Sequence, residues 1–176
     1  MPAGYGGPAR KHPAGLIGKL MKLTELLSPE RVLPNIAAET PWQAMEELID
    51  HLIAEGRVGA DRRESFLTAL HEREEQVSTG IGFGVAIPHA YCGTLSSAEA
   101  VLGRSVDGIE FESPDNAPVH FIILLLVPEN QAQSHLQTLA AVAGVFSIGE
   151  VREQLKDAES PEDLISIIAA SENSSD

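Results

Sequence analysis

The chain of 176 residues has few basic residues and a single cysteine. It contains 12 Lys and Arg against 26 Asp and Glu, which gives a formal net charge of −14 at pH 7. A chain this acidic is not expected to bind nucleic acid through a basic face. Cys92 alone cannot form an internal disulfide or a four-cysteine zinc site, so we expect it to be a small apolar filler.

The acidic charge lies beyond the N-terminal segment. Residues 1–22 contain four basic residues and no acid, so the rest of the chain carries eight basic against 26 acidic residues. Such a body favours a basic protein partner through electrostatic steering. Residues 1–18 are rich in Gly and Pro and lack the apolar core of a secretory signal or membrane span. We therefore expect residues 1–20 to be a disordered tail and the protein not to be inserted in a membrane.

The remaining sequence predicts one α/β domain over residues 21–171, followed by a disordered C-terminus at 172–176. We expect a mixed central sheet with helices on both sides. Residues 119–127 are apolar at successive positions, which predicts the central strand of a covered sheet. The other predicted strands are 32–36, 85–89 and 98–105. Predicted helices begin after Thr40 and Asp61 and span 135–146, 149–156 and 161–170, the last capped by Ser160.

The segment 78–89 carries the strongest chemical signal. Three glycines at alternate positions lead into a short apolar run that ends at Pro88 and His89. Glycine allows close backbone approach, so N–H groups here can converge on an oxyanion, and Pro88 restricts the backbone before the histidine. A neutral imidazole in this place is a candidate nucleophile for a phosphoryl group. The alternative interpretation is an ordinary loop followed by a structural histidine.

A second histidine follows the predicted central strand. After Pro128 a polar loop leads to a helix for which we predict Ser134 as the N-cap, which places His135 in the first turn. The free N–H groups and positive dipole of a helix start favour a neutral imidazole and attract phosphate. The alternative is a solvent-exposed histidine without a role in a site.

Taken together, these stretches resemble the enzyme IIA domain of the phosphoenolpyruvate-dependent sugar phosphotransferase system, in the fructose/mannitol class that includes the nitrogen-regulatory IIA proteins. The resemblance runs over about residues 23–168. It is carried by Arg73-Glu74-Glu75, Ser78-Thr79-Gly80-Ile81-Gly82, Ala86-Ile87-Pro88-His89, Leu126-Val127-Pro128 and His135-Leu136-Gln137-Thr138-Leu139.

The resemblance implies that His89 is phosphorylated, that His135 is the second active-site histidine and that Arg73 lies beside them. Arg73 has a guanidinium fork suited to phosphate oxygens, although a surface ion pair with neighbouring glutamates is the alternative. We also expect Thr79, Gly80, Gly82 and Ser134 to bind phosphate. This list completes the predicted site, for which we expect neither a cofactor nor a metal.

The implied function is that of a cytoplasmic phosphocarrier, which accepts phosphate from HPr on His89 and passes it to a IIB partner. The alternative is a nitrogen-regulatory protein that controls partner proteins through its phosphorylation state. A zinc hydrolase is disfavoured because no closely spaced His/Glu ligand pair accompanies either histidine. Nucleotide binding is disfavoured because no Gly-Lys-Ser/Thr follows the glycines. Ala90-Tyr91 and Phe83 depart from the usual family pattern, and we expect these departures to affect the choice of partner.

Overall fold

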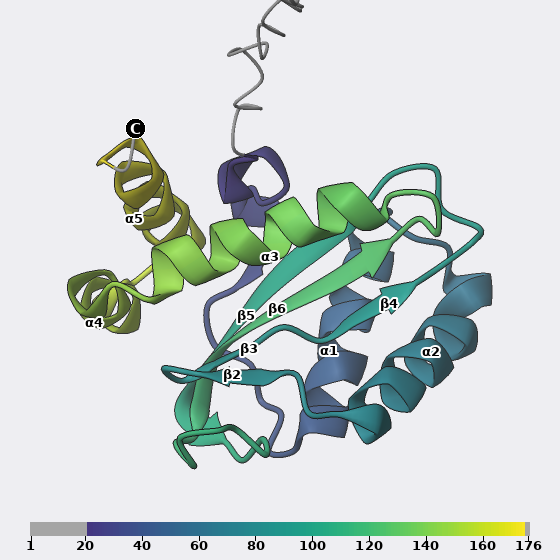
Figure 1. Ribbon diagram of the computed structural model, residues 1–176, viewed down its shortest axis with the longest axis horizontal. Helices are drawn as coiled ribbons and strands as arrows, with labels where there is room; N and C mark the ends of the chain where they lie inside the picture. The colour runs from purple at the N-terminus through teal and green to yellow at the C-terminus, as the bar shows by residue number, and fades with distance from the viewer. Residues whose placement is uncertain (1–20, 175–176) are drawn as a thin grey trace, which may run out of the picture.

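The computed structural model describes residues 21–174; the predicted tail at 1–20 lies outside the described residues (Figure 1). Six strands form one mixed sheet in the order β1-β5-β6-β3-β2, and β4 pairs with β6 beyond the end of β3. The strands are β1 (Val32–Leu33), β2 (Gly80–Gly82), β3 (Val85–Ala86), β4 (His89–Tyr91), β5 (Glu99–Ile109) and β6 (Val119–Val127). Parallel and antiparallel pairs both occur, which confirms the predicted mixed sheet.

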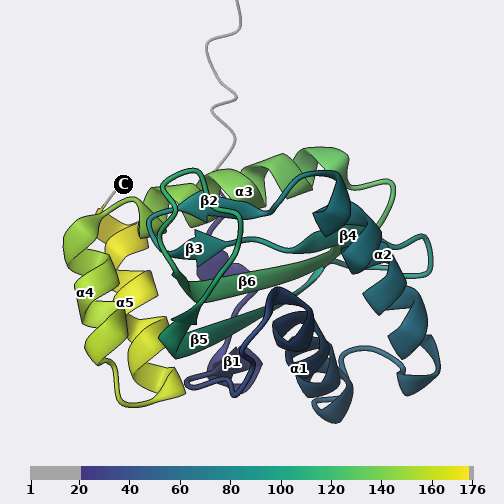
Figure 2. The ribbon, with the colours of Figure 1, turned by 90° about the horizontal axis from the view of Figure 1, so that it is seen from below.

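Helices cover both faces of the sheet, as predicted. One face packs on α1 (Pro41–Ala54) and α2 (Arg63–Gln76). The other packs on α3 (Ala132–Phe146), α4 (Gly149–Asp157) and α5 (Pro161–Ser174). Figure 2 shows α3 and α1 on opposite sides of the strands. Within residues 21–174, no helix combines the length and apolar character needed to cross a membrane.

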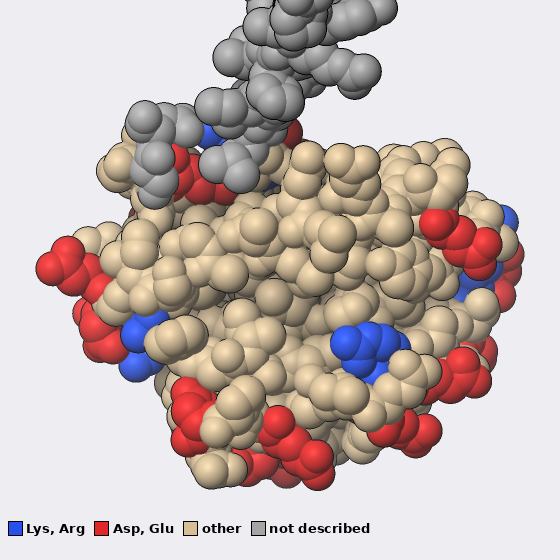
Figure 3. All heavy atoms as spheres, in the orientation of Figure 1, with Lys and Arg blue, Asp and Glu red and all other residues tan. Residues whose placement is uncertain are grey.

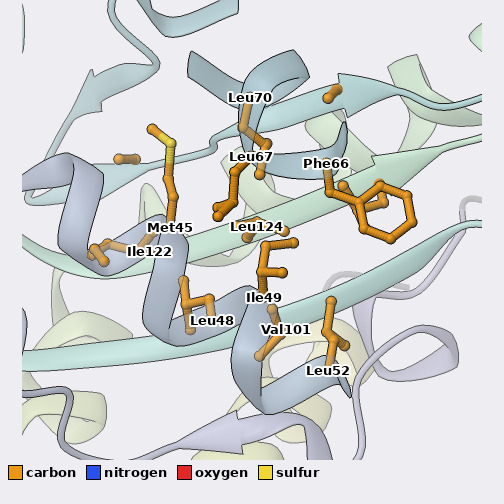
Figure 4. Close-up of a cluster of buried hydrophobic side chains, with 14 of the residues drawn as sticks. Met45, Leu48, Ile49, Leu52, Phe66, Leu67, Leu70, Val101, Ile122 and Leu124 are labelled. Atoms are coloured by element: carbon orange, nitrogen blue, oxygen red, sulfur yellow. The ribbon is translucent and has the colours of Figure 1, made fainter. Parts of the chain in front are cut away.

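Strand β6 is the centre of the fold, which confirms the prediction for 119–127. Its side chains alternate between the two apolar cores, so that Ile122 and Leu124 face α1 and α2 while Ile123 and Leu125 face the other helices. Figure 4 shows the first of these cores between the sheet and the two helices. Burial on both faces explains why this strand has no polar alternation.

Prolines end or divide two predicted strands. The strand predicted at 32–36 stops at Leu33, because Pro34 has no N–H to donate to the ladder. The strand predicted at 85–89 is divided into β3 and β4, with Pro88 between them. The Pro88 carbonyl still accepts a hydrogen bond from Leu125 N at 2.9 Å. His89 therefore begins a strand, whereas we predicted that it would end one.

Two of the predicted helix caps are confirmed, those at Thr40 and Ser160, whereas the cap predicted at Asp61 is absent. The N–H of Gln43 donates to Thr40 Oγ1 at 3.2 Å, and the N–H of Asp163 donates to Ser160 Oγ at 3.1 Å. The prediction for Asp61 is wrong, because residues 60–62 form a 3₁₀ turn and α2 begins at Arg63 without a side-chain cap.

The C-terminal helix continues further than predicted. α5 extends to Ser174, so the prediction of disorder is wrong for residues 172–174. Glu172 explains this extension: its carboxylate accepts hydrogen bonds from Leu23 N and, at 2.7 Å, from Thr24 Oγ1. The end of the helix is thereby joined to the first described turn of the chain.

Arg104 on β5 connects α4 to the sheet. Its side chain is buried, and its Nε donates to Pro34 O at 2.7 Å. Its Nη1 donates to the carbonyls of Leu155 and Ala158 at 2.9 and 2.7 Å, and to that of Lys156 at 3.1 Å. A cation is well placed at the C-terminal end of a helix, where unpaired carbonyls carry partial negative charge.

Arg104→Met is expected to lower the free energy of unfolding by about 3 kcal/mol, because it leaves buried carbonyls without donors. Urea denaturation measures this change. Arg62→Met is the matched control, since the Arg62 side chain is 43% exposed and should contribute less than about 1 kcal/mol. Equal unfolding midpoints for both variants would contradict a structural role for Arg104.

Candidate active site

The His89 ring is fixed by its own backbone. Its Nδ1 lies 2.9 Å from the carbonyl oxygen of Ile87. A carbonyl only accepts hydrogen bonds, so Nδ1 carries the proton and Nε2 keeps its lone pair. His89 pairs with Leu125 in the parallel β4–β6 ladder, at the end of the sheet where the loop before α3 leaves β6.

Arg73, in the last turn of α2, reaches the free nitrogen of His89. Its Nε donates to His89 Nε2 at 3.3 Å, and its Nη1 donates to Val77 O at 2.9 Å. No carboxylate in residues 21–174 lies within ion-pair distance of Arg73. The surface ion-pair alternative for Arg73 is therefore wrong in this structure, and its charge faces the nucleophile.

His135 completes the cluster from α3. Its ring centroid lies 4.7 Å from that of His89, with the ring planes at 43°. The ring is 4% exposed, and its Nδ1 is buried without a hydrogen-bond partner in the described part of the chain. Only Nε2 of His135 remains available to a group bound at His89.

Both imidazoles favour the neutral form. Burial lowers the pKa of His135 to about 4, with further lowering by His89 and Arg73. Burial also lowers the pKa of His89; the hydrogen bond to Ile87 O opposes this change, Arg73 adds to it and Glu74 opposes it. A neutral His89 at pH 7 is the form that can act as a nucleophile.

The helix that carries His135 begins earlier than predicted. α3 starts at Ala132 with Gln131 as its N-cap residue, and the N–H of His135 donates to Gln131 O at 3.0 Å. The prediction of Ser134 as N-cap is wrong, because the turn from Pro128 to Gln131 already initiates the helix. Ser134 occupies the third helical position, where its N–H belongs to the first turn without an intrahelical acceptor. It lines a pocket of about 220 Å³ together with His135.

The predicted phosphate-binding residues Thr79, Gly80 and Gly82 serve the β2–β3 hairpin. Both the N–H and the hydroxyl of Thr79 donate to the Glu74 carboxylate. A Cβ at Gly80 would lie 2.4 Å from Ser113 Oγ, so glycine is required there for close packing. Gly82 pairs with Val85, about 13 Å along the strands from His89. The structure does not bring these glycines to His89, and phosphate binding by the three residues stays a prediction.

Glu74 and Tyr91 also belong to the site, although from the sequence we assigned Glu74 no role of its own and Tyr91 only an expected effect on the choice of partner. Glu74 fixes the chain between α2 and β2 by accepting from Ser78 Oγ at 3.1 Å as well as from Thr79. The Tyr91 ring meets the His135 ring edge-on, with centroids 5.5 Å apart. Tyr91 was recognisable from spacing alone, because residues two apart on a strand share a face with each other.

Other candidate groups lie in structural contacts. The Nε2 of His51 is 2.7 Å from Glu30 O, and His71 packs edge-on against Trp42. Cys92 is buried, and burial together with Glu129 raises the pKa of its thiol to about 11. Among residues 21–174 there is no group of three His, Cys, Asp or Glu side chains arranged to hold a metal ion.

Residues 25–171 match the family described as "Phosphoenolpyruvate-dependent sugar phosphotransferase system, EIIA 2". The chain is 38% identical over 126 residues to the fructose-specific EIIA component of Haloferax volcanii, covering 72% of this chain and 80% of that protein. It is 32% identical over 149 residues to a nitrogen regulatory protein of Bradyrhizobium diazoefficiens, covering 85% and 95%. It spans only 23% of the fructose-specific EIIABC component of Bacillus subtilis, at 34% identity over 84% of this chain.

Solved structures show the same fold. The nitrogen regulatory protein IIA-Ntr of Neisseria meningitidis superposes with a TM-score of 0.75 at 32% identity, covering 82% of this chain and 97% of that one. The mannitol IIA of Escherichia coli superposes with a TM-score of 0.68 at 19% identity, covering 81% and 98%. The similarity to mannitol IIA concerns the fold alone.

The low pKa of His135 makes stability depend on pH. Between pH 6.5 and 4 the unfolded histidine binds a proton that the folded one does not, so stability falls as pH falls through this range. Urea unfolding at pH 7 and pH 4.5 should show that the wild type loses more stability than His135→Gln, by a difference on the order of 3 kcal/mol. Equal losses in the two proteins would contradict the depressed pKa.

The fold, the paired histidines and the match across residues 25–171 agree with one another. The departures found above concern helix starts and strand ends, and leave His89, His135 and Arg73 together. The chain belongs to the EIIA 2 family of the phosphoenolpyruvate-dependent sugar phosphotransferase system.

Proposed function

We propose that the protein is a cytoplasmic phosphocarrier that accepts a phosphoryl group from an HPr-like protein on Nε2 of His89 and passes it to a IIB protein. One observation carries this proposal: Nδ1 of His89 donates to Ile87 O, so the free lone pair lies on Nε2, beside Arg73. Family membership and the similarity to a fructose-specific EIIA component support it.

In the proposed step, the Nε2 lone pair of His89 attacks phosphorus, and the bond between phosphorus and the donor nitrogen breaks with its electron pair returning to the donor ring. The Nδ1 proton stays in place, and Ile87 O stabilises the positive charge that the His89 ring acquires. The guanidinium of Arg73 turns from Nε2 to the phosphoryl oxygens. His135 contributes an N–H from Nε2 in its neutral form. Transfer to the acceptor reverses these contacts.

A regulatory role is the second candidate, in which the phosphorylation state of His89 decides which protein the chain binds. The observation behind it is the match over 95% of a nitrogen regulatory protein at 32% identity, which stands beside the match over 80% of a fructose-specific EIIA component at 38% identity. Both functions need the same site. Transfer from phosphorylated His89 to a IIB protein supports the carrier role, whereas binding of a protein to only one phosphorylation state supports regulation.

His89→Ala should abolish labelling by enzyme I, HPr and phosphoenolpyruvate, because it removes the proposed nucleophile. His51→Ala is the matched control and should label like the wild type, since within residues 21–174 the His51 ring hydrogen-bonds to Glu30 O and not to any group of the His89 cluster. NMR of the phosphorylated wild type should place phosphorus on Nε2 of His89. If the phosphoryl label is recovered on His135, then His135 is the nucleophile and the assignment of His89 is wrong.

Arg73→Lys should slow transfer from HPr by roughly a hundredfold, because a point charge replaces a planar fork that can hold two phosphoryl oxygens. The melting temperature should change little, since the side chain is not held by an ion pair within residues 21–174. Arg62→Lys serves as the control for loss of a guanidinium elsewhere. If Arg73→Lys accepts phosphate from HPr at the wild-type rate, Arg73 does not take part in the reaction.

A further inference from the structure

Phe83 has a costly backbone conformation at the tip of the β2–β3 hairpin. Its φ is 59°, between Gly82 at 89° and Gly84 at 73°. Bulky residues are rare in this left-handed region, which glycine and asparagine adopt more easily. The Phe83 side chain is 56% exposed, so burial within this chain does not offset the strain. Asp115 stabilises the turn by accepting from Phe83 N at 2.9 Å. A strained, exposed aromatic residue points to a role outside the fold.

Phe83 borders an apolar groove that leads to the active site. The groove has a volume of about 380 Å³ and lies between the hairpin and α3. Ile87 lines it, and the carbonyl of the same residue fixes the His89 ring. Leu139 lines it one helical turn after His135. Phe83 precedes His89 by six positions, which corresponds to at most about 20 Å along an extended chain.

A basic side chain lies at the groove, and the acidic side chains lie toward the edges of the same face. The Arg152 guanidinium lies 4.9 Å from the centre of the Phe83 ring, and no carboxylate in residues 21–174 pairs with it. Figure 3 shows this face as largely uncharged with small basic areas, while acidic residues gather along its lower and right edges. The centre is therefore suited to apolar contacts and the rim to a basic protein.

We infer that Phe83 and this groove form a docking surface for the protein that donates the phosphoryl group to His89. The inference rests on the proposed function. The donor inserts an apolar side chain into the groove beside Phe83 and presents basic residues to the acidic rim. A standard interface buries about 800 Å² per partner, a disc roughly 30 Å across, so a donor centred on His89 extends about 15 Å from it and reaches the groove at Ile87, which Phe83 also lines. Phe83 is thus a residue for partner recognition, apart from the reacting groups.

Phe83→Gly tests the inference because it removes the ring and relieves the backbone. Titration calorimetry with HPr should show at least a tenfold weaker affinity, while the melting temperature stays equal or rises. Phe83→Asn, which tolerates the same φ, should show the same loss. Val106→Ala is the control for loss of an exposed apolar side chain, because Val106 is 61% exposed on β5 and does not line the groove, and it should bind HPr like the wild type. Phosphoramidate, a small donor without a docking surface, should label His89 equally in all four proteins.

If both Phe83 variants bind HPr with wild-type affinity, the inferred docking surface is wrong. The proposed function still holds in that case, provided that His89 is labelled. A loss in Phe83→Gly alone would indicate a loosened hairpin and would also overturn it. If neither HPr nor phosphoramidate labels His89 in the wild type, the proposed function fails and the inference fails with it. A drop in the Val106→Ala affinity equal to that of the Phe83 variants would show that the effect is not specific to the groove.

Discussion

The site depends on one interruption of the sheet at Pro88. If residues 85–91 formed one continuous strand, hydrogen bonds to β6 would fix the backbone conformation of each residue up to and including His89. Pro88 lacks an N–H, so β3 ends at Ala86, and β4 resumes the pairing with β6 at Leu125 without a change of register. Within this short segment the Ile87 carbonyl becomes available to His89 Nδ1. The choice of tautomer, and with it the reactive nitrogen, therefore follows from a break in β-sheet hydrogen bonding.

The groups around His89 come from separate parts of the fold, each held by its own contacts. Arg73 arrives from the end of α2, where its second contact is the Val77 carbonyl. His135 arrives from α3, which follows directly from the central strand. Glu74 ties the end of α2 to the hairpin through Ser78 and Thr79. Rigid elements therefore position the reacting groups, as phosphoryl transfer requires, because its catalysis relies on geometry and charge more than on covalent help.

Local patterns in the sequence predicted much of this structure. The apolar run at 119–127 predicted the central strand, and Thr40 and Ser160 predicted helix starts, because each signal depends on near neighbours. The motifs also predicted the meeting of His89, His135 and Arg73, through family resemblance. The failures have two causes: competition between neighbouring local signals, and contacts between residues far apart in the sequence. Ser134 is a good N-cap, yet the turn at Pro128 starts α3 earlier, and Glu172 orders the last turn of α5 through a contact 148 residues away in sequence.

The glycine run shows a further limit of sequence patterns. Its alternate glycines are compatible with a phosphate-binding loop and with a tight hairpin, and the hairpin depends on Ser113, which packs at Gly80, and on Asp115, which accepts from Phe83 N. Those residues lie about 30 positions away along the chain, so no local pattern contains them. The side chain that this hairpin displays, Phe83, was noticed in the sequence only as a departure from the family pattern.

The burial of Cys92 has a consequence for the redox behaviour of the protein. Because burial and Glu129 raise the pKa of the Cys92 thiol to about 11, the thiol stays protonated at pH 7. Oxidants and alkylating reagents attack the thiolate, so the sole cysteine, three residues after His89, is chemically quiet. The chemistry at His89 is thereby separated from the oxidation state of its surroundings, and the wild-type chain already provides a background for attaching a thiol-specific probe to a cysteine introduced at the surface.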